Sequence, residues 1–517
     1  MKTIVILFDN ENSAYKNEKV FNNKSALQMT LEWAKNLKFP VESIKAQSLN
    51  QLLEQMSQAC KKHDADTVIF SFDDCPFLNL EITRKLLDFH TEYKSEYTFA
   101  DGYPYGFAPE IIHSGTINIL YELSKTSQKE LGLESVNNES IFNLIKTDIN
   151  SFEVETLMAD EDWRLLRLKF DCGKKESFFA CKALFDECKA NIEQNIDDLS
   201  RLAANCPKVL KTLPAFYNLQ ISDAITSEDI YSPYKLAFEE KYKNPPVNYS
   251  INQSAKFNLM NFEDFSTLID KINEYSQQAV ISLSAFGDAF THPQLLKMIE
   301  KILSYKGLSV FLESNGIFIN DDFCNHLKEI VDSCPPRNNG WEKVMIAIDI
   351  DAFSSSVYQK IHINCPQNSF EKSVEAVKKL NQLLPGNVYP QFTRMNQNEE
   401  ELEAFFRYWN EKSNPSGGKF IIQKYDNFCK KLPESKPADL SPLDRKVCWH
   451  LRRDLTILTN GDVPRCRECI NTNIIGNVFK NSLEDIWNKN ESLIQAHINH
   501  QYDEICGKCD EYYTFYF

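Results

Sequence analysis

Hydrophobic positions in the first quarter of the chain alternate between short apolar runs and longer amphipathic stretches. Short apolar runs predict buried strands, and apolar residues at helical spacing predict helices that cover a sheet. The predicted strands are Thr3–Phe8, Val41–Ala46 and Thr67–Phe72, and the predicted helices are Ala26–Leu37, Leu49–His63 and Ile82–Tyr93. This order is typical of a parallel sheet with helices on its faces, in which ligands bind beyond the carboxyl ends of the strands.

The pattern becomes more polar between residues 127 and 206. Here we predict a connector with a short strand at Leu165–Phe170 and a helix at Leu184–Leu202. We place the first domain, together with this connector, at residues 1–206.

A second alternation of strands and helices begins at residue 207. The predicted strands are Phe216–Ile221, Val280–Ala285, Leu308–Glu313, Val344–Ile350, Val388–Met395 and Phe420–Lys424, and the helices between them include Phe262–Tyr275, Pro293–Tyr305, Asp321–Val331, Phe370–Leu384 and Glu399–Trp409. Six such units predict a partial (β/α)6 barrel, whose ligand site would lie at the carboxyl ends of the strands. We place this domain at residues 207–430.

Near the C-terminus, the spacing of the cysteines indicates a metal site. The chain carries the pairs Cys466-x2-Cys469 and Cys506-x2-Cys509, and Cys448 precedes both pairs. Cysteines at this spacing aim two sulfurs at one metal, and a strand, an Asn-Gly turn and a returning strand carry one ligand toward the others. We therefore predict a metal centre in a third domain, residues 431–517.

These residues resemble a known module. Cys448-x12-Gly461-x4-Cys466, followed by Ile-Gly-Asn, a Leu-x-x-Ile-Trp helix and the final Cys-x2-Cys, resembles the SPASM domain, an iron–sulfur module of many radical S-adenosylmethionine enzymes. The resemblance implies one auxiliary [4Fe–4S] cluster held by Cys448, Cys466, Cys506 and Cys509, with Cys469 as an alternative ligand. A structural zinc site at the two Cys-x2-Cys pairs is the other interpretation, and it leaves Cys448 unused.

The predicted barrel resembles that of the radical S-adenosylmethionine enzymes themselves. The loop around Gly287 and Asp288 is similar to the family's Gly-Gly-Glu-Pro loop, so the resemblance implies that both residues bind the cofactor; a solvated loop acid is the alternative for Asp288. The three cysteines of the family's first cluster are absent, and their positions are occupied by Ile225, Asp229 and Ser232. Isoleucine is no ligand for iron and serine is a poor one. We therefore expect no cleavage of S-adenosylmethionine, and we expect the C-terminal cluster to lie away from Gly287.

The first domain resembles nucleotidyltransferases of the cytidylyltransferase type. Asp74-Cys75-Pro76 is similar to their Gly-Asp-x-Pro segment, which implies Asp74 as a ligand for the divalent metal of a nucleotide. The basic, glycine-rich phosphate loop is missing, because Asp9–Ser13 follows the first strand with two acids and no glycine. We expect this domain to be a retained scaffold, with Asp73 and Asp74 in a solvated turn.

Composition narrows the class of protein. The net charge of −16 argues against nucleic acid or an anionic membrane as a partner. Fifteen cysteines in 517 residues, with an opening apolar run too short for a signal peptide or membrane span, indicate reduced thiols in the cytoplasm.

Taken together, the three segments resemble the spiro-SPASM proteins of spirochaetes. We interpret the chain as an iron–sulfur protein with a small-molecule or peptide substrate and a redox partner. The alternatives are a nucleotidyltransferase-like enzyme whose C-terminal half is regulatory, and a zinc-stabilised interaction protein.

Overall fold

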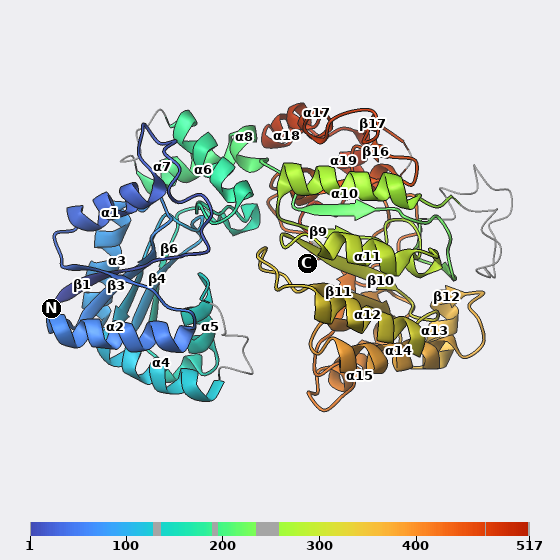
Figure 1. Cartoon of the computed structure of the whole chain (residues 1–517), viewed down its shortest axis with the longest axis horizontal. Helices are drawn as coiled ribbons and strands as arrows, with labels where there is room; N and C mark the ends of the chain where they lie inside the picture. Colours follow the sequence, from blue (N-terminus) through green and yellow to red (C-terminus); the bar gives the residue numbers. More distant parts are fainter. Residues whose placement is uncertain (1, 128–135, 189–194, 234–257, 471, 515–517) are drawn as a thin grey trace. The chain divides into compact units, whose positions relative to one another are not determined.

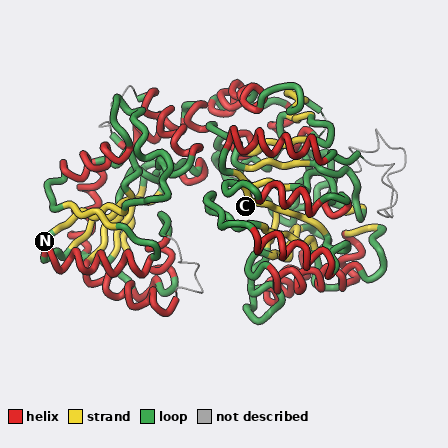
Figure 2. Tube along the Cα trace, in the orientation of Figure 1, coloured by secondary structure: helices red, strands yellow, loops and turns green. Residues whose placement is uncertain are grey.

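The computed structural model describes residues 2–127, 136–188, 195–233, 258–470 and 472–514 (Figure 1). The chain forms two compact units, Met1–Thr212 and Leu213–Phe517. Each unit combines a sheet with helices, as the strands and helices in Figure 2 show. The predicted α/β fold class is confirmed, and the domain boundaries predicted at residues 206 and 430 stay predictions.

The first unit contains a six-stranded sheet of order β2-β1-β3-β5-β4-β6. Its strands are β1 (Thr3–Phe8), β2 (Val41–Ile44), β3 (Thr67–Phe72), β4 (Tyr97–Asp101), β5 (Glu110–His113) and β6 (Val154–Met158). The sheet is mixed and not parallel as predicted, because β5 runs antiparallel to both β3 and β4. Only eight residues join β4 to β5, and an antiparallel pair needs no long crossover.

The helices of the first unit begin where side chains cap them. Its helices are α1 (Ala26–Asn36), α2 (Leu49–His63), α3 (Leu80–Tyr93), α4 (Ser114–Ser127), α5 (Ser140–Lys146), α6 (Lys175–Glu187), α7 (Ile196–Ala204) and α8 (Pro207–Leu210). Ser25, Ser48 and Asn79 accept hydrogen bonds from backbone N–H groups in the first turns of α1, α2 and α3, which satisfies donors that the helix leaves unpaired.

Two predictions for residues 127–206 are wrong. Leu165–Phe170 forms no strand; a short 3-10 helix occupies Arg164–Leu166, and the strand of this region is β6. The helix predicted at Leu184–Leu202 is divided between α6 and α7, and residues 189–194 lie outside the described part of the chain. The spacing of apolar residues is helical on both sides of the break between α6 and α7, so the sequence pattern suggested one helix where there are two.

The second unit contains a seven-stranded parallel sheet of order β14-β13-β11-β10-β9-β7-β15, a central half-barrel. Its strands are β7 (Phe216–Leu219), β9 (Ala279–Ser282), β10 (Leu308–Ser314), β11 (Val344–Asp349), β13 (Val388–Arg394), β14 (Ile421–Lys424) and β15 (Asp454–Ile457). All six predicted barrel strands are present. The seventh, β15, comes from the cysteine-rich segment and pairs with β7 along its whole length.

Helices cover the sheet of the second unit and share one core with it. They are α10 (Phe262–Ser276), α11 (Leu295–Leu303), α12 (Asp321–Ser333), α13 (Ser355–Ile361), α14 (Ser369–Leu383) and α15 (Leu402–Trp409). The buried core contains Tyr217 and Ile346 of the sheet and Leu268 of α10, and it continues into Val463 and Trp487 of the cysteine-rich segment. The C-terminal segment is therefore stabilised by the same hydrophobic core as the half-barrel.

The cysteine-rich segment, residues 448–510, is built from short elements. They are α16 (Trp449–Arg453), β16 (Asp462–Pro464), a 3-10 helix (Arg467–Cys469), β17 (Ile474–Asn477), α17 (Leu483–Asn488), α18 (Glu491–Ile498) and α19 (Glu504–Lys508). The predicted strand, Asn460-Gly461 turn and returning strand are present as β15, the turn and β16, although β15 forms its ladder with β7 and β16 forms its ladder with β17. The turn itself requires glycine: Gly461 has φ 82°, and a Cβ there would lie 2.3 Å from the Phe479 ring.

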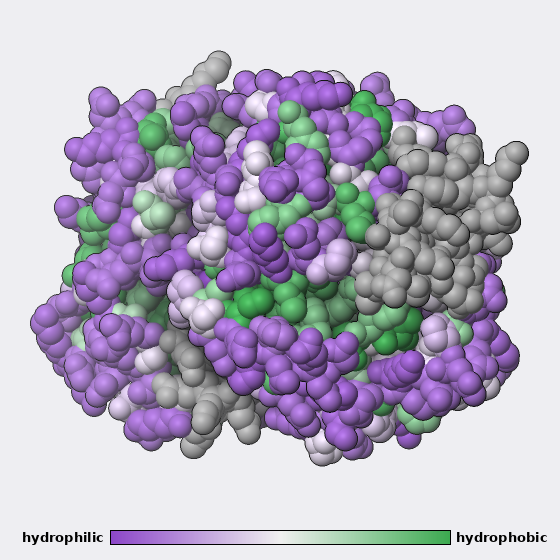
Figure 3. All heavy atoms as spheres, turned by 45° about the vertical axis from the view of Figure 1, so that its right-hand side comes forward, coloured by the Kyte–Doolittle hydropathy of each residue, from purple (hydrophilic) through white to green (hydrophobic). Residues whose placement is uncertain are grey.

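Hydrophilic side chains dominate the face of the molecule in Figure 3, with smaller hydrophobic areas between them. Among the described residues, no helix combines the length and the hydropathy that crossing a membrane requires.

Candidate metal centre and barrel pocket

The four predicted ligands come from three places in the C-terminal segment. Cys448 directly precedes α16, Cys466 directly precedes the Arg467–Cys469 3-10 helix, and Cys506 and Cys509 lie in and directly after α19. All four side chains line a single cavity, together with His450 and Glu468 among others. The fold thus brings together the thiols that the spacing singled out.

The α19 pair is held in place by local contacts. Asp503 caps the helix by accepting a hydrogen bond of 2.8 Å from the backbone N–H of Cys506. Arg465 pairs with Asp503 and places a guanidinium nitrogen 3.8 Å from the Cys506 sulfur. The guanidinium favours a thiolate, the form of cysteine that binds metals, but burial and the charge of Asp503 outweigh it and raise the pKa of Cys506 to about 12.

Cys469 also lies close to the centre. Its sulfur is 3.7 Å from that of Cys466, and its side chain is fully buried. The hydrogen bond with Cys466 lowers the pKa of Cys469 to about 6. Cys469 is not among the residues that line the cavity, so its role as an alternative ligand stays a prediction.

The spacing of the sulfurs bears on which group would fit. A tetrahedral zinc ion with bonds of about 2.3 Å holds its sulfurs about 3.8 Å apart. In the described part of the chain, no three thiols lie with all their sulfurs within 4.8 Å of one another. Four cysteine sulfurs around one cavity are the donor set of an iron–sulfur cluster as well as of a zinc ion, and the Cys466 and Cys469 sulfurs, 3.7 Å apart, lie at the zinc spacing.

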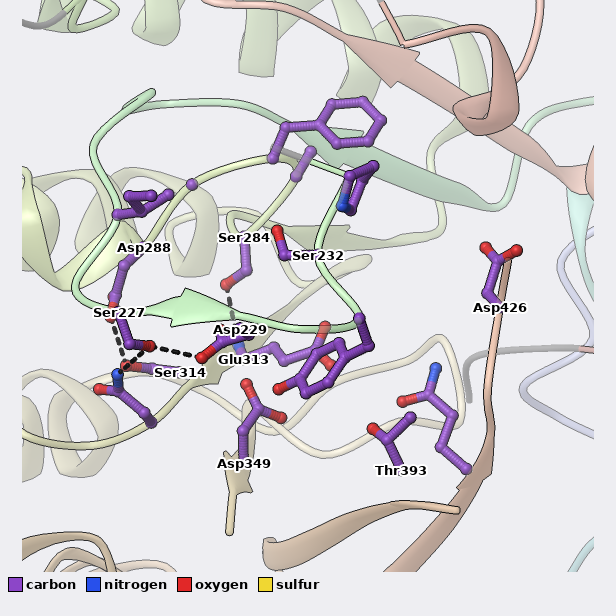
Figure 4. Close-up of a pocket in the computed structure, with 18 of the residues that line it drawn as sticks. Ser227, Asp229, Ser232, Ser284, Asp288, Glu313, Ser314, Asp349, Thr393 and Asp426 are labelled. Atoms are coloured by element: carbon purple, nitrogen blue, oxygen red, sulfur yellow. Dashed lines mark hydrogen bonds between the residues drawn. The ribbon is translucent and has the colours of Figure 1, made fainter. Parts of the chain in front are cut away.

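A second cavity lies at the carboxyl ends of the half-barrel strands (Figure 4). The loops after β7, β9, β10 and β14 contribute to it, as do Asp349 at the end of β11 and Thr393 near the end of β13. Its labelled side chains are carboxylates and hydroxyls, with Asp229, Glu313 and Asp349 near one another and Asp426 farther along the wall. The strand ends therefore form a pocket where the fold predicts one.

Both residues predicted for cofactor binding, Gly287 and Asp288, line this pocket. A Cβ at Gly287 would lie 1.8 Å from the Ser222 carbonyl oxygen, so only glycine permits this approach of the two loops. Asp288 is not a solvated loop acid: it is 8% exposed and accepts hydrogen bonds from the Phe290 backbone N–H and the Ser314 hydroxyl. Burial raises its pKa to about 6.

The loop that replaces the cluster-binding cysteines is clamped by a histidine. Asp229, at one of the three cysteine positions, lies 2.6 Å from Nδ1 of His362, and the two residues are register partners in a short β8–β12 ladder (Glu228–Asp229 with His362–Ile363). On its other side, Nε2 of His362 is 3.3 Å from Asp351. His362 and Asp351 are fully buried, so this arrangement is an ion-pair clamp inside the half-barrel.

Two further carboxylates of the pocket share an amide. Gln391 donates hydrogen bonds to Glu313 (2.6 Å) and Asp349 (2.8 Å). Burial, together with the nearby charge of Glu313, raises the pKa of Asp349 well above its ordinary value. This wall favours a cationic or hydrogen-bond-donating ligand group.

Arg467 connects the two cavities. It lines both of them, lies 3.2 Å from Asp426, and stacks over the Phe428 ring at 5.2 Å. Ile470, from the same segment, packs against Phe286 next to Gly287. The cysteine-rich segment thus reaches this loop, because β15 pairing with β7 draws the segment onto the half-barrel. The expected separation of the cluster from Gly287 stays a prediction.

Asp426, Asp510 and Glu511 form a group whose oxygens lie close enough together for one ion. Lys424 pairs with Glu511 and lies 3.1 Å from Asp510, and Arg467 pairs with Asp426. These cations neutralise the carboxylates, so the group is an ion-pair network.

In the first unit, Asp73 and Asp74 are 3% and 2% exposed, so the prediction of a solvated turn is wrong. Burial and the charge of Asp171 raise the pKa of Asp74 to about 7. Lys16 lies 2.5 Å from Asp9 and 2.8 Å from Asp73. The buried cation of this site is thus paired with carboxylates and is not available to phosphate.

We expect no nucleoside triphosphate to bind the first unit in the presence of magnesium, because Lys16 is neutralised by Asp9 and Asp73. Isothermal titration calorimetry of the full chain tests this expectation. Micromolar binding would contradict it; in that case Asp74→Asn, which removes a metal ligand, should weaken binding by about tenfold, or about 1.4 kcal/mol.

Comparison with known proteins identifies the kind of domain that carries the cysteines, and then a relative of the whole chain. A family model described as an iron–sulfur cluster-binding domain, SPASM, matches residues 448–510. The chain therefore carries an iron–sulfur cluster-binding domain, on the segment that holds the candidate ligands. The chain belongs to the same family as an uncharacterized protein of Treponema pallidum (strain Nichols), with 36% identity over 383 residues, which are 73% of this chain and 98% of that protein.

Two solved structures are similar at low identity. BtrN in complex with AdoMet and 2-DOIA matches 58% of this chain and 94% of its own, with 12% identity and a TM-score of 0.36. A cytidylyltransferase from Leptospira borgpetersenii serovar Hardjo-bovis matches 41% of this chain and 97% of its own, with 16% identity and a TM-score of 0.32.

Three residues of these sites escaped the prediction from sequence. His362 and Arg467 are isolated in sequence, and Cys429 has no partner at metal spacing. The only signal for Cys429 was its place directly after the last barrel strand. Their partners lie 133, 41 and 39 residues away, for Asp229, Asp426 and Glu468 respectively.

Proposed function

We propose that this protein binds one [4Fe–4S] cluster through Cys448, Cys466, Cys506 and Cys509, and that its half-barrel does not generate the 5′-deoxyadenosyl radical. The convergence of these four thiols on one cavity carries the proposal. Bound there, the cluster would supply one-electron redox chemistry, with a potential set by nearby charge and solvent access.

The protein's own residues would tune such a group. Arg465 and Arg467 place positive charge beside the thiols, and Glu468, which is 6% exposed, places a carboxyl group among them. Positive charge near a cluster favours its reduced form, because reduction adds a negative charge. Electron transfer, substrate anchoring and structural support are the roles open to this centre.

The half-barrel pocket supports a role without radical chemistry. Ile225, Asp229 and Ser232 line it at the positions of the missing cysteines. The Asp229 carboxylate is already engaged by buried His362. We propose that the pocket holds a small molecule or a peptide side chain, and that a redox partner exchanges electrons with the C-terminal centre.

The proposal predicts iron and acid-labile sulfide in the anaerobically purified protein, and no 5′-deoxyadenosine. After anaerobic reconstitution, S-adenosylmethionine and a strong reductant are added and 5′-deoxyadenosine is measured. We expect none above the level without protein, because three thiolates that leave one iron open are missing from the half-barrel. Multiple turnovers that disappear in Cys506→Ala would mean that the C-terminal cluster performs the cleavage, and would contradict the proposal.

Zinc without sulfide would favour the zinc-stabilised alternative. A colourless protein that holds about one zinc per chain, and that needs Cys466, Cys469, Cys506 and Cys509 to hold it, is the result that overturns the cluster assignment.

A further inference from the structure

His497 is a buried histidine whose ring nitrogens the surrounding protein does not use. It lies near the end of α18 and is 1% exposed. Among the described residues, neither its Nδ1 nor its Nε2 has a hydrogen-bond partner. Buried polar groups in proteins are almost always hydrogen-bonded, and an unpaired one is costly. The unpaired imidazole therefore points to a further group that contacts it.

Another buried histidine of the same unit shows the usual arrangement. His292 is 5% exposed, and both of its ring nitrogens are used. Its Nε2 lies 2.9 Å from the Met260 carbonyl oxygen, and its Nδ1 accepts a 3.1 Å hydrogen bond from the Gln294 backbone N–H. Burial in this unit does not by itself leave an imidazole unpaired.

His497 differs from His292 in what it faces, because it lines the cavity of the four candidate cysteines. Tyr502 packs against its ring edge-on, with the ring centroids 5.0 Å apart. Arg445 stacks over the Tyr502 ring at 4.1 Å and donates a 2.8 Å hydrogen bond to the Cys506 carbonyl oxygen. This series of contacts places His497 at the Cys506 end of the cavity.

The position of α18 is fixed by the segment that holds Cys506. Asn490, directly before the helix, donates a 3.0 Å hydrogen bond to the carbonyl oxygen of Arg465. A guanidinium nitrogen of Arg465 lies 3.8 Å from the Cys506 sulfur. Ile494, one turn before His497, is fully buried in the core. The imidazole is therefore held at the cavity by packing on both sides of the helix turn.

The two arginines beside Cys506 also have donors to spare. The Nε atoms of Arg445 and Arg465 are buried and have no hydrogen-bond partner within the described part of the chain. Arginine Nε can only donate, and an imidazole carries at least one N–H in every protonation state. Unused donors on three side chains at one end of a cysteine-lined cavity fit an acceptor that binds in the cavity.

The sulfur atoms of the proposed cluster are acceptors of this kind. Each iron of a [4Fe–4S] group takes one cysteine sulfur, so four cysteines leave no iron for an imidazole. Hydrogen bonds to the sulfurs are one of the factors that set the reduction potential. Reduction makes the sulfurs more negative, which strengthens a hydrogen bond that they accept.

We propose that His497 donates an N–H hydrogen bond to a sulfur atom of the C-terminal cluster and thereby raises its reduction potential. His497 makes no bond to iron, and it transfers no proton or electron. The inference rests on the proposed cluster. It assigns to His497 the tuning of the centre and not the role of a fifth ligand.

The test compares His497→Met, His497→Gln, His326→Met and Cys448→Ser with the unmodified full chain, all purified anaerobically. Met and Gln have similar size and helix propensity, but only Gln retains an N–H donor. His326→Met is the control for loss of a histidine elsewhere in the unit, because His326 is an exposed residue of α12. The readouts are iron and sulfide per chain and the reduction potential, measured by electron paramagnetic resonance during a redox titration.

We expect both His497 variants and His326→Met to keep their iron and sulfide, and Cys448→Ser to lose most of both. In His497→Met the equilibrium constant for reduction should fall about tenfold, which is about 59 mV toward lower potential for one electron. His497→Gln should recover at least half of this shift, because its amide can donate in place of the imidazole. The potential of His326→Met should equal that of the unmodified protein.

Two results would overturn the inference. One is a potential in His497→Met equal to that of the unmodified protein, and the other is a loss of iron in His497→Met as complete as in Cys448→Ser, which would make His497 a ligand. If His497→Met does not fold, His497→Phe replaces it, because it lacks the N–H and keeps an aromatic ring against Tyr502. Failure of the proposed function is distinguishable, because the unmodified protein would then contain no iron or sulfide.

Discussion

Cys448→Ser should lose most of the iron and sulfide that the unmodified protein holds. Serine is a poor ligand for iron compared with thiolate, and Cys448 is 9% exposed at the wall of the cavity. Metal binding is coupled to folding in small sites of this kind, so the variant should also melt at a lower temperature. Anaerobic iron and sulfide analysis, together with thermal melting, measures both effects.

The controls separate this result from general damage to the fold. Cys324→Ser removes a buried thiol from helix α12 and should leave the metal content unchanged. Cys469→Ser should also retain metal if Cys469 is not a ligand. Unchanged metal content in Cys448→Ser, with loss in Cys469→Ser, would instead indicate a zinc site built from the two Cys-x2-Cys pairs.

His362→Gln should destabilise the second unit by about 3–5 kcal/mol, the usual cost of removing one partner from a buried ion pair. The change leaves Asp229 and Asp351 without their cation, and Asp351 is fully buried. Urea unfolding followed by tryptophan fluorescence measures the loss, and His326→Gln is the control. His326 is 54% exposed beside Asp322, so its replacement should change stability by about 0.5 kcal/mol at most.

The effect of His362 should depend on pH. Burial lowers its pKa, but Asp229 and Asp351 outweigh burial and raise the pKa well above its ordinary value. A group with a raised pKa contributes all of its stabilisation below the unfolded value, about 6.5, and loses it as pH rises through the folded value. The difference between the unmodified protein and His362→Gln should therefore shrink in alkaline solution. Equal stability of the two proteins at pH 6 would contradict the clamp.

If the clamp holds the pocket, losing it should also loosen the loop at residues 225–233. Hydrogen exchange in this loop and in residues 362–363 should then become faster in His362→Gln, while the β9 and β10 strands remain protected. Exchange that accelerates equally across the whole sheet would indicate a global loss of stability and no specific role in the pocket.

The sequence by itself determined most elements and the candidate ligands. Strands such as Thr3–Phe8 and Val344–Asp349 appear as apolar runs because both faces of their sheets are buried. Helices such as Leu49–His63 appear because one face packs on a sheet, and a serine marks where this helix begins. The cysteine spacing was sufficient to select four thiols that the fold places on one cavity.

Only the tertiary structure decided which elements meet. A hydrophobic period reports that a strand is buried but not which strand it pairs with, so the sequence did not reveal that β15 joins β7 and that β16 joins β17. The antiparallel direction of β5 could not be predicted either, because burial of a strand does not show which way the strand runs. Contacts such as Asp229 with His362 and Asp426 with Arg467 join residues far apart in the chain. They depend on how loops close over the strand ends, which local periodicity does not encode.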